Sequence, residues 1–181
     1  AIRQLWARKL DQDNQQLPRP QRHRNLEPVS AQFIAALAIG IGAQQLLEIG
    51  GASGISTIAL GAAARASNGK LISIEIEKVR QEEAKETISR LGLSRYVDFI
   101  PGDAALVLPT LGQMSFVLID CEKEDYIKFF EMSKLASGSI VVADNIISHN
   151  LWDYVRHVRS RSGTESMTFP IGKGLEVSRF L

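Results

Sequence analysis

Two apolar stretches of the chain end in acidic side chains, and these acids could bind a cation. Phe116–Ile119 leads into Asp120, and Ser139–Ala143 leads into Asp144 and Asn145. A buried strand has little reason to end on a carboxylate unless that carboxylate faces a cleft. Two carboxylates and one amide would supply three oxygen ligands, which are the ligands that a hard divalent cation prefers. The pattern predicts a cation site where the two strands end.

A glycine-rich turn follows the first predicted strand. The turn misses the dinucleotide pattern G-x-G-x-x-G, because Ala52 and Ile55 occupy the places of its second and third glycines. It is not a phosphate-binding P-loop either, since no Gly-Lys-Ser/Thr sequence follows. What remains is acid-x-Gly-x-x-x-Gly, formed by Glu48, Gly50 and Gly54. Such a turn suits a nucleoside that carries no pyrophosphate, and a plain strand–helix connection is the alternative.

The next two predicted strands also end in acids. Glu75 lies 25 positions after Gly50, where an acid can accept hydrogen bonds from ribose hydroxyls. Asp103, in the sequence Gly102-Asp103-Ala104, could accept a hydrogen bond from an adenine amino group. Taken singly, each acid could be an ordinary surface residue. A glycine turn and two acids on three consecutive strand ends together favour a nucleoside site.

Alternating strands and helices must position these side chains. Strands separated by helices predict βαβ units and a mostly parallel sheet, whereas the last two strands, with no helix between them, must pair as an antiparallel hairpin at an edge. We predict a single doubly wound α/β domain with about seven strands. The predicted helices are Ile2–Leu10, Pro28–Ile41, Gly54–Ala66, Lys78–Leu91, Ala104–Leu111, Glu124–Leu135 and Leu151–Arg159. The predicted strands are Gln45–Ile49, Leu71–Ile76, Val97–Ile100, Met114–Ile119, Ile140–Ala143, Met167–Pro170 and Leu175–Phe180.

The composition is that of an ordinary globular protein. Its 181 residues are 45% hydrophobic and 23% charged, and the net charge of +1 does not mark the whole molecule as a polyanion binder. The single cysteine, Cys121, excludes an internal disulfide and fits a reducing compartment. No apolar run is long enough for a membrane helix, and no signal-peptide pattern is present. We expect a cytoplasmic protein with no membrane partner.

The beginning of the chain is more basic than the rest. Residues 1–24 contain five arginines and one lysine against two aspartates. One interpretation is a solvated helix and linker, and the other is an arm that contacts nucleic acid or an anionic substrate. We divide the chain into an N-terminal helix and basic linker, residues 1–27, and a domain over residues 28–181.

From about Val29 to Leu181, the sequence resembles class I S-adenosylmethionine-dependent methyltransferases. More narrowly, it is similar to the cation-dependent O-methyltransferases of the catechol and caffeoyl-CoA type and their bacterial relatives. The resemblance implies a Rossmann-like methyltransferase domain. The segments that carry it are Leu47-Glu48-Ile49-Gly50, Gly54-Ile55-Ser56-Thr57, Ile74-Glu75, Gly102-Asp103-Ala104, Ile119-Asp120-Cys121-Glu122-Lys123, Asp125-Tyr126, Asp144-Asn145 and Ile171-Gly172-Lys173-Gly174-Leu175.

The resemblance also implies roles for individual residues. Asp120, Asp144 and Asn145 would hold Mg²⁺, or Mn²⁺ or Ca²⁺ in its place, and Lys123 would act as general base beside Asp120. The alternatives are an exposed lysine at a helix start and, for Asp144-Asn145, a helix N-cap. The methyl donor, S-adenosylmethionine, would be bound by Glu48, Gly50, Gly54, Ser56, Glu75, Asp103, Ala104 and Asp120, with Ser30 and Gln32 as weaker assignments.

The predicted function is methylation of a catechol-like or other vicinal-hydroxyl small molecule. Two alternatives stay open: methylation of a hydroxylated uridine in tRNA, in which the basic segment Arg19–Arg24 would contact phosphates, and a donor-binding partner subunit without catalysis. A homodimer is also left open. The segment after Asn145 reaches Trp152 sooner than the resemblance implies, so the wall of the acceptor site is not predicted.

Overall fold

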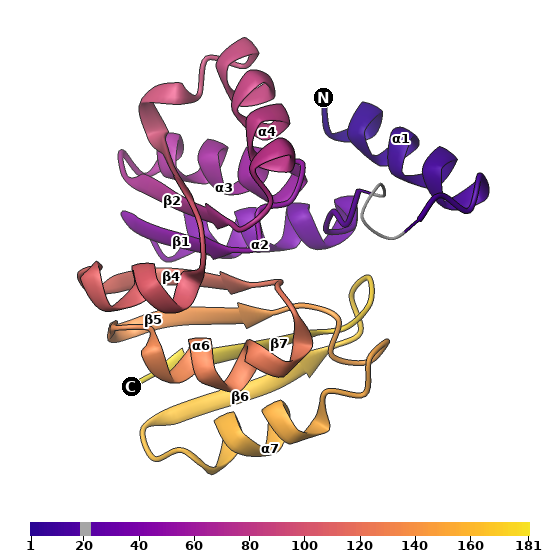
Figure 1. The fold of residues 1–181 in the computed structure, drawn as a ribbon. Helices are drawn as coiled ribbons and strands as arrows, with labels where there is room; N and C mark the ends of the chain where they lie inside the picture. Colours follow the sequence, from indigo (N-terminus) through magenta and orange to yellow (C-terminus); the bar gives the residue numbers. More distant parts are fainter. Residues whose placement is uncertain (19–22) are drawn as a thin grey trace.

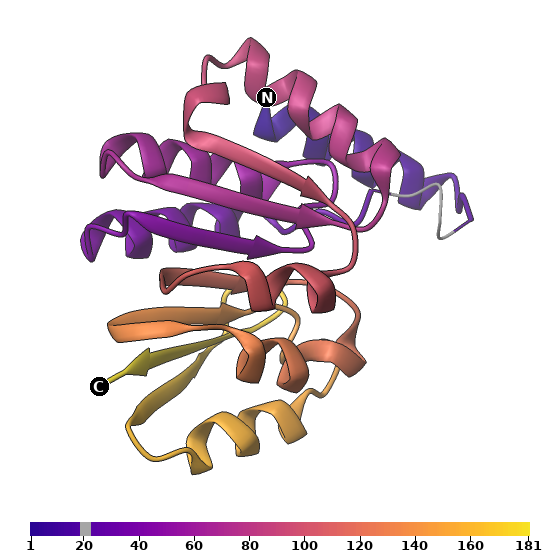
Figure 2. The same ribbon diagram turned by 60° about the vertical axis from the view of Figure 1, so that its left-hand side comes forward.

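The structure is a computed structural model that describes residues 1–18 and 23–181. One seven-stranded sheet is covered by helices on both faces (Figure 1, Figure 2). The strands are β1 Gln45–Ile49, β2 Lys70–Glu75, β3 Val97–Pro101, β4 Met114–Ile119, β5 Leu135–Ala143, β6 Thr164–Phe169 and β7 Leu175–Phe180. The α-helices are α1 Ile2–Asn14, α2 Pro28–Gly40, α3 Ile55–Ala66, α4 Lys78–Arg90, α5 Ala104–Val107, α6 Tyr126–Met132 and α7 Trp152–Ser160.

The strand order places the acid-tipped strands next to one another. The order is β3-β2-β1-β4-β5-β7-β6, with β1 to β5 parallel and β7 antiparallel to both β5 and β6. The chain order reverses between β1 and β4, and such a reversal leaves a crevice at the carboxyl ends of the strands. The predicted fold class, including the antiparallel C-terminal hairpin, is confirmed.

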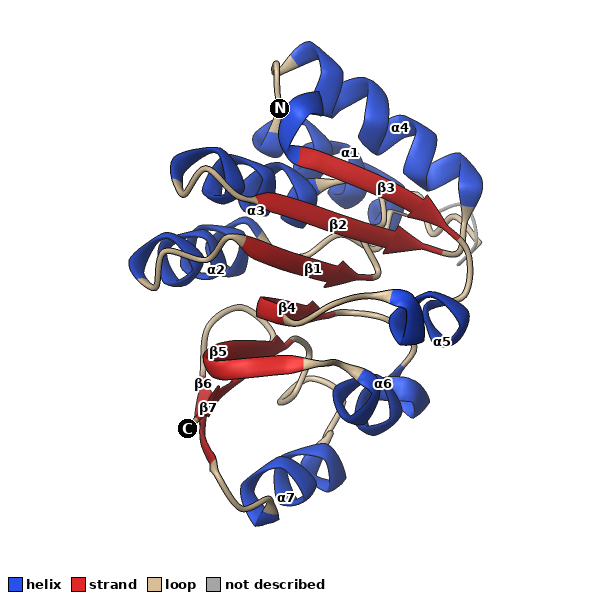
Figure 3. Ribbon diagram, turned by 90° about the vertical axis from the view of Figure 1, so that its left-hand side faces the viewer, coloured by secondary structure: helices blue, strands red, loops and turns tan. Residues whose placement is uncertain are grey.

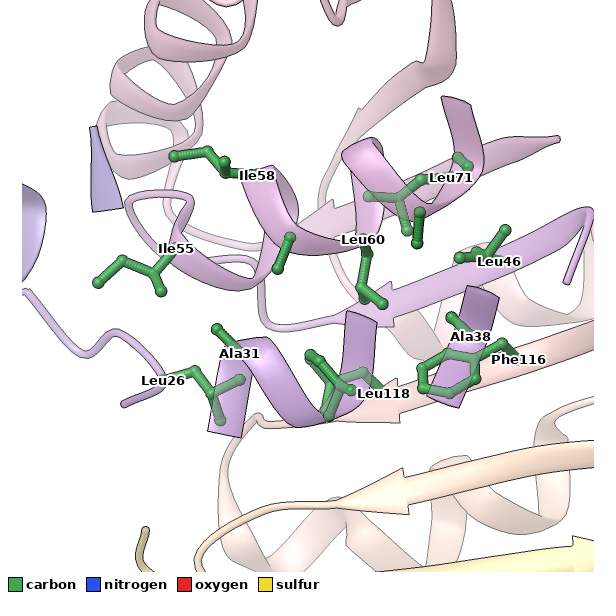
Figure 4. Close-up of a cluster of buried hydrophobic side chains, with 14 of the residues drawn as sticks. Leu26, Ala31, Ala38, Leu46, Ile55, Ile58, Leu60, Leu71, Phe116 and Leu118 are labelled. Atoms are coloured by element: carbon green, nitrogen blue, oxygen red, sulfur yellow. The ribbon is translucent and has the colours of Figure 1, made fainter. Parts of the chain in front are cut away.

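Helices cover both faces of the sheet (Figure 3), and two hydrophobic cores hold them there. One core joins α2, α3 and α4 to one face, and Leu60, Leu46 and Phe116 are fully buried in it (Figure 4). The other core joins α6 and α7 to the opposite face around Tyr126 and Phe130. Because neighbouring residues of a strand point to opposite faces, Leu46 and Leu47 enter different cores.

The predicted elements differ from the structure mainly around β5. The helix predicted over Glu124–Leu135 is three residues too long at its end, because α6 ends at Met132 and Leu135 already belongs to β5. Leu135 pairs with Met114 and Ile140 with Phe116, so β5 contains a bulge of several extra residues. Gly138 lies inside this bulge at φ 81°. Periodicity alone does not reveal a strand interrupted in this way.

The N-terminal helix α1 packs against the domain through buried Leu5. It extends to Asn14, beyond the predicted end at Leu10, and ends before Pro18. Arg19 and Arg22 of the predicted basic linker lie outside the described residues. Within residues 1–18 and 23–181, no helix is long and apolar enough to cross a membrane.

Candidate active site

A cleft of about 990 Å³ lies at the carboxyl ends of β1, β2, β4 and β5. The turns after these strands form its floor, and residues from the N-terminal region form part of its rim. The predicted site residues that line it are Gly50, Glu75, Asp103, Ala104, Asp120, Lys123, Asp144 and Asn145. The strand ends that carry these residues therefore meet around one cleft.

The glycine turn allows the backbones of β1 and β4 to approach closely. Gly50 has φ 94°, which residues with a Cβ rarely adopt, and a Cβ built on it would lie 2.1 Å from the carbonyl oxygen of Asp120. The Gly50 amide donates to the Ile74 carbonyl at 2.9 Å, and the Asp120 amide donates to the Ile49 carbonyl at 2.9 Å. Gly50 thus sets the distance between the two halves of the cleft.

Glu48 supports the turn from beneath and does not line the cleft. Its side chain is fully buried and accepts hydrogen bonds from Ser73 at 2.6 Å and Thr57 at 2.7 Å. A Cβ on Gly51 would lie 2.8 Å from this carboxylate. Burial raises the pKa of Glu48, and the surrounding hydroxyls, including that of Ser56, oppose the shift. Its position is that of a residue that holds the glycine turn in shape.

Glu75 and Asp103 line the cleft at the ends of β2 and β3. The Glu75 carboxylate accepts hydrogen bonds from the backbone amides of Ala52 and Glu77, at 2.8 and 2.9 Å. These bonds fix the carboxylate at the strand end, and each oxygen retains a lone pair for a ligand hydroxyl. Asp103 caps α5 by accepting from the Ala105 amide at 2.8 Å. Its exposed side chain lies beside buried Ala104 on the cleft wall.

The two predicted acids meet at one point, joined by Asn145. The Asn145 side-chain nitrogen donates to Asp120 at 2.8 Å and to Asp144 at 2.9 Å. Asp144 is buried, and its Oδ1 atom has no hydrogen-bond partner among the described residues. Asn145 itself has φ 64°, a left-handed conformation that is uncommon outside glycine. The strands therefore bring two carboxylates together with few groups to neutralise them.

Burial raises the pKa of both acids. Loss of solvent is the largest cause for each, and for Asp144 the negative charge of Asp120 is the second cause, which brings its pKa to about 8. Lys123 and Lys173 oppose the shift at both acids. A buried pair of carboxylates that resists ionisation is stabilised by a bound cation.

Lys123 and Tyr126 form a short chain of polar contacts beside the acids. The Lys123 ammonium lies 3.5 Å from Asp120 and donates to the Tyr126 hydroxyl at 2.7 Å. That hydroxyl donates to the Asp144 carbonyl at 3.2 Å. Tyr126 is 1% exposed, so its ring holds the lysine from a fixed position. The side chain of Lys123 is directed into the site, unlike an ordinary exposed lysine at a helix start.

The rim of the cleft is closed by ion pairs from the N-terminal region. Arg24 pairs with Glu122, next to the acid-tipped end of β4. His23 lies 3.0 Å from Glu83 of α4, which also pairs with Arg8 of α1. These contacts hold the N-terminal segment along the rim of the cleft.

The side-chain oxygen atoms at the ends of β4 and β5 fit a divalent cation. Two adjacent carboxylates, a buried oxygen without a partner and raised carboxyl pKa values each indicate a place where positive charge is favourable. Rotating the Asn145 amide by half a turn would present its oxygen where its nitrogen now lies. The described residues contain no cluster of three His, Cys, Asp or Glu side chains suited to a metal, so this amide is needed as the third ligand.

Several predicted donor residues lie outside the cleft lining. Glu48, Gly54 and Ser56 do not line it. Gly54 has φ 103°, and a Cβ built on it would lie 3.0 Å from the Cβ of Ala84 in α4. Ser30 is buried near Gly172, and Gln32 is exposed on α2.

Sequence reasoning also missed residues that line the site or support it. Tyr126, Asn25 and Lys173 were not assigned roles, and Arg24 was considered only as a phosphate contact in the tRNA alternative. Asn25 is 5% exposed, lines the cleft, and accepts a hydrogen bond from the Ser53 amide at 3.2 Å. Lys173 stood between two glycines in a segment that carries the resemblance, which gave it no role of its own. Asn25 follows a polar segment and had no signal.

The sequence matches a family model and curated proteins of known activity. The family model described as O-methyltransferase matches residues 7–160. A catechol O-methyltransferase from Niastella koreensis is 33% identical over 130 residues, covering 68% of this chain and 58% of the relative. A catechol O-methyltransferase from Mycobacterium tuberculosis is 36% identical over 126 residues, covering 66% and 57%. The chain thus spans less than two thirds of the length of these relatives.

Solved structures show the same fold at lower identity. The O-methyltransferase TomG from Streptomyces achromogenes, in complex with S-adenosylmethionine, has a TM-score of 0.83 at 21% identity, covering 97% of this chain and 88% of that one. An O-methyltransferase from Bacillus cereus has a TM-score of 0.82 at 18% identity, covering 99% and 90%. At these identities the similarity concerns the fold.

Proposed function

The chain belongs to the O-methyltransferase family, and on that premise we propose that it transfers a methyl group from S-adenosylmethionine to a hydroxyl of a catechol-like small molecule. The observation that carries the proposal is the meeting of Asp120, Asp144, Asn145 and Lys123 in one cleft with Glu75 and Asp103. The part of the cleft around Glu75 and Asp103, here called the donor half, offers hydrogen-bond acceptors for a nucleoside. The part around Asp120, Asp144 and Lys123, the acceptor half, offers oxygen ligands for a cation and a base, which suit a pair of neighbouring hydroxyl groups.

In this proposal the donor lies along the ends of β1, β2 and β3. Glu75 accepts hydrogen bonds from the ribose hydroxyls, and Asp103 accepts from the adenine amino group. Because Gly50 lies close to the Asp120 carbonyl, a donor bound over the glycine turn would lie next to the end of β4. Methyl transfer is an in-line displacement, so placing donor and acceptor in contact removes much of the barrier.

The acceptor half activates the hydroxyl. A divalent cation held by Asp120, Asp144 and Asn145 would lower the pKa of the hydroxyl and fix its direction. Lys123, in its neutral form, takes the hydroxyl proton on Nζ, and the oxygen attacks the methyl carbon as the sulfur–carbon bond breaks. Tyr126 holds Nζ in place through its 2.7 Å contact. The products are the methyl ether, S-adenosylhomocysteine and the proton on Lys123.

The test is transfer of labelled methyl to catechol with Mg²⁺ or with a chelator, in the wild type and in Asp144→Ala. We expect turnover to need the cation and to fall at least about 100-fold in the variant. Donor binding, measured by calorimetry, should change by less than about threefold, since Asp144 lies on the acceptor side. Asp98→Ala is the control, because Asp98 pairs with Lys70 at the exposed start of β2. Full activity in chelator would refute the cation mechanism.

Methylation of tRNA is less well supported by the structure than methylation of a small molecule. Arg19 and Arg22 of the basic segment lie outside the described residues, and Arg24 already pairs with Glu122. Neutralising the three arginines should leave the affinity for tRNA and its salt dependence unchanged. A smaller salt slope would favour the tRNA proposal. Donor binding without methyl transfer to any acceptor would favour a non-catalytic subunit.

A further inference from the structure

Lys173 holds a fixed place on the acceptor side of the cleft. It lies in the turn between β6 and β7, and its carbonyl accepts hydrogen bonds from the amides of Ile147 and Ser148, at 3.2 and 3.1 Å. Gly172 and Gly174 flank it with φ 57° and 92°. A Cβ on Gly174 would lie 2.5 Å from Ile147, so the turn is pressed against the segment after Asn145. The backbone of Lys173 is thereby anchored.

The other basic side chains of the cleft already have partners. Lys9 pairs with Asp13, His23 with Glu83, Arg24 with Glu122 and Lys123 with Asp120. Arg80 and His149 also take part in interactions. Within the described part of the chain, no hydrogen bond or ion pair involves the Lys173 ammonium. Among the described residues, the Lys173 ammonium forms no ion pair with Glu27, although the Glu27 carboxylate lies 3.1 Å from the position of a Cβ on neighbouring Gly172.

The charges of the acceptor half do not balance without a further anion. In the proposed function, the charges of Asp120 and Asp144 are matched by the divalent cation. The proton that leaves the acceptor hydroxyl is carried by Lys123, so that exchange adds no net charge. The positive charge of Lys173 remains, close enough to affect the ionisation of both acids. In a partly buried site, an unmatched charge favours a ligand of opposite charge.

We propose that Lys173 binds an anionic substituent of the acceptor, so that the preferred substrates are catechols that carry a carboxylate. This inference rests on the proposed function and adds the charge of the substrate to it. The Lys173 ammonium, at one end of the acceptor half, would bind the carboxylate of the substrate while its two hydroxyl groups lie beside Asp120 and Asp144. Lys173 would thus determine specificity without taking part in the proton transfer.

The experiment compares two catechols that differ mainly in charge, 3,4-dihydroxybenzoate and 4-methylcatechol. Their binding is measured by calorimetry with Mg²⁺ and S-adenosylhomocysteine present, and kcat and KM are measured with the methyl donor. We expect the wild type to bind 3,4-dihydroxybenzoate about tenfold more tightly than 4-methylcatechol. In Lys173→Met the affinity for 3,4-dihydroxybenzoate should fall to that for 4-methylcatechol, and the affinity for 4-methylcatechol should not change. Lys173→Arg should retain the preference for 3,4-dihydroxybenzoate. Lys70→Met, at the opposite end of the sheet and paired with Asp98, is the matched control.

The outcomes separate the inference from the function it rests on. Equal binding of the two catechols by the wild type would overturn the inference, as would an equal loss for both in Lys173→Met, which would indicate a structural role. If the wild type neither binds nor methylates either compound, the proposed function is rejected and the inference falls with it. A higher KM for the acid at unchanged kcat in Lys173→Met would support it.

Discussion

Replacing Asp144 by Asn should stabilise the metal-free protein at high pH. In the folded protein burial and Asp120 raise the Asp144 pKa from 3.8 to about 8. Between these values the folded state holds the carboxyl protonated while the unfolded chain holds it ionised, so the folded state binds more protons. Stability therefore falls as pH rises from about 4 to about 8. An amide of the same shape removes this dependence.

The magnitude follows from the pKa shift. At pH 8 the folded-state pKa lies about four units above the unfolded value, and each unit is worth about 1.4 kcal/mol, which sets a limit of about 5 kcal/mol. Entry of water and movement of Lys123 and Lys173 toward the carboxylate reduce this limit. We expect Asp144→Asn to raise the free energy of unfolding by about 1–3 kcal/mol at pH 8, and by much less at pH 5.

Urea denaturation followed by tryptophan fluorescence, at pH 5 to 8 in chelator, measures this difference. Asp98→Asn, an exposed site, should change the stability by less than about 0.5 kcal/mol at every pH. With Mg²⁺ at about 100 times its dissociation constant, the wild type should gain about 2.7 kcal/mol and Asp144→Asn much less. A metal-free difference that stays flat from pH 5 to 8, or a destabilised Asp144→Asn at pH 8, would refute the buried-pair reasoning.

Three further substitutions test other parts of the structure. Lys123→Met should lower kcat by about 100-fold or more while leaving donor affinity nearly unchanged, since the base is removed and the donor half is intact; calorimetry and turnover assays measure both, and a small loss would exclude Lys123 as the base. Gly50→Ala should destabilise the fold by more than about 2 kcal/mol in urea, because the added Cβ overlaps the Asp120 carbonyl; wild-type stability would contradict the close approach. Leu60→Ala should cost about 2–5 kcal/mol without changing KM, because Leu60 is fully buried and distant from the cleft; a changed KM would show coupling to the site.

The fold followed largely from local patterns. Alternating apolar strands and helices predicted a parallel sheet, and the helix-free connection between β6 and β7 predicted the hairpin. The prediction was wrong where β5 begins, because the bulge around Gly138 depends on pairing with β4, a segment more than 20 residues away. Pairing between distant segments leaves no periodic signal in either one.

The site followed from chain order only in part. Asp120 and Asp144 come directly after buried strands, so a parallel sheet had to bring them to one edge. Which side of the edge a carboxylate faces depends on the strand register. Glu48 is also an acid near a strand end, but it lies inside β1, one residue before its end, where its side chain is buried beneath the turn and accepts bonds from Ser73 and Thr57. The difference between a ligand and a support is one of orientation.

Short apolar runs and the residues that immediately follow them fix the class of fold, the sheet edge at which the cleft forms and the residue types at the strand ends. Contacts between segments far apart in the chain set the surroundings of those residues. Burial of the acid pair, the contact of Tyr126 with the Asp144 carbonyl, the ion pair of Arg24 with Glu122 and the packing of the Lys173 turn against Ile147 all arise in this way. Burial and charge are set by every group packed around a side chain, and the local sequence specifies only a few of those groups.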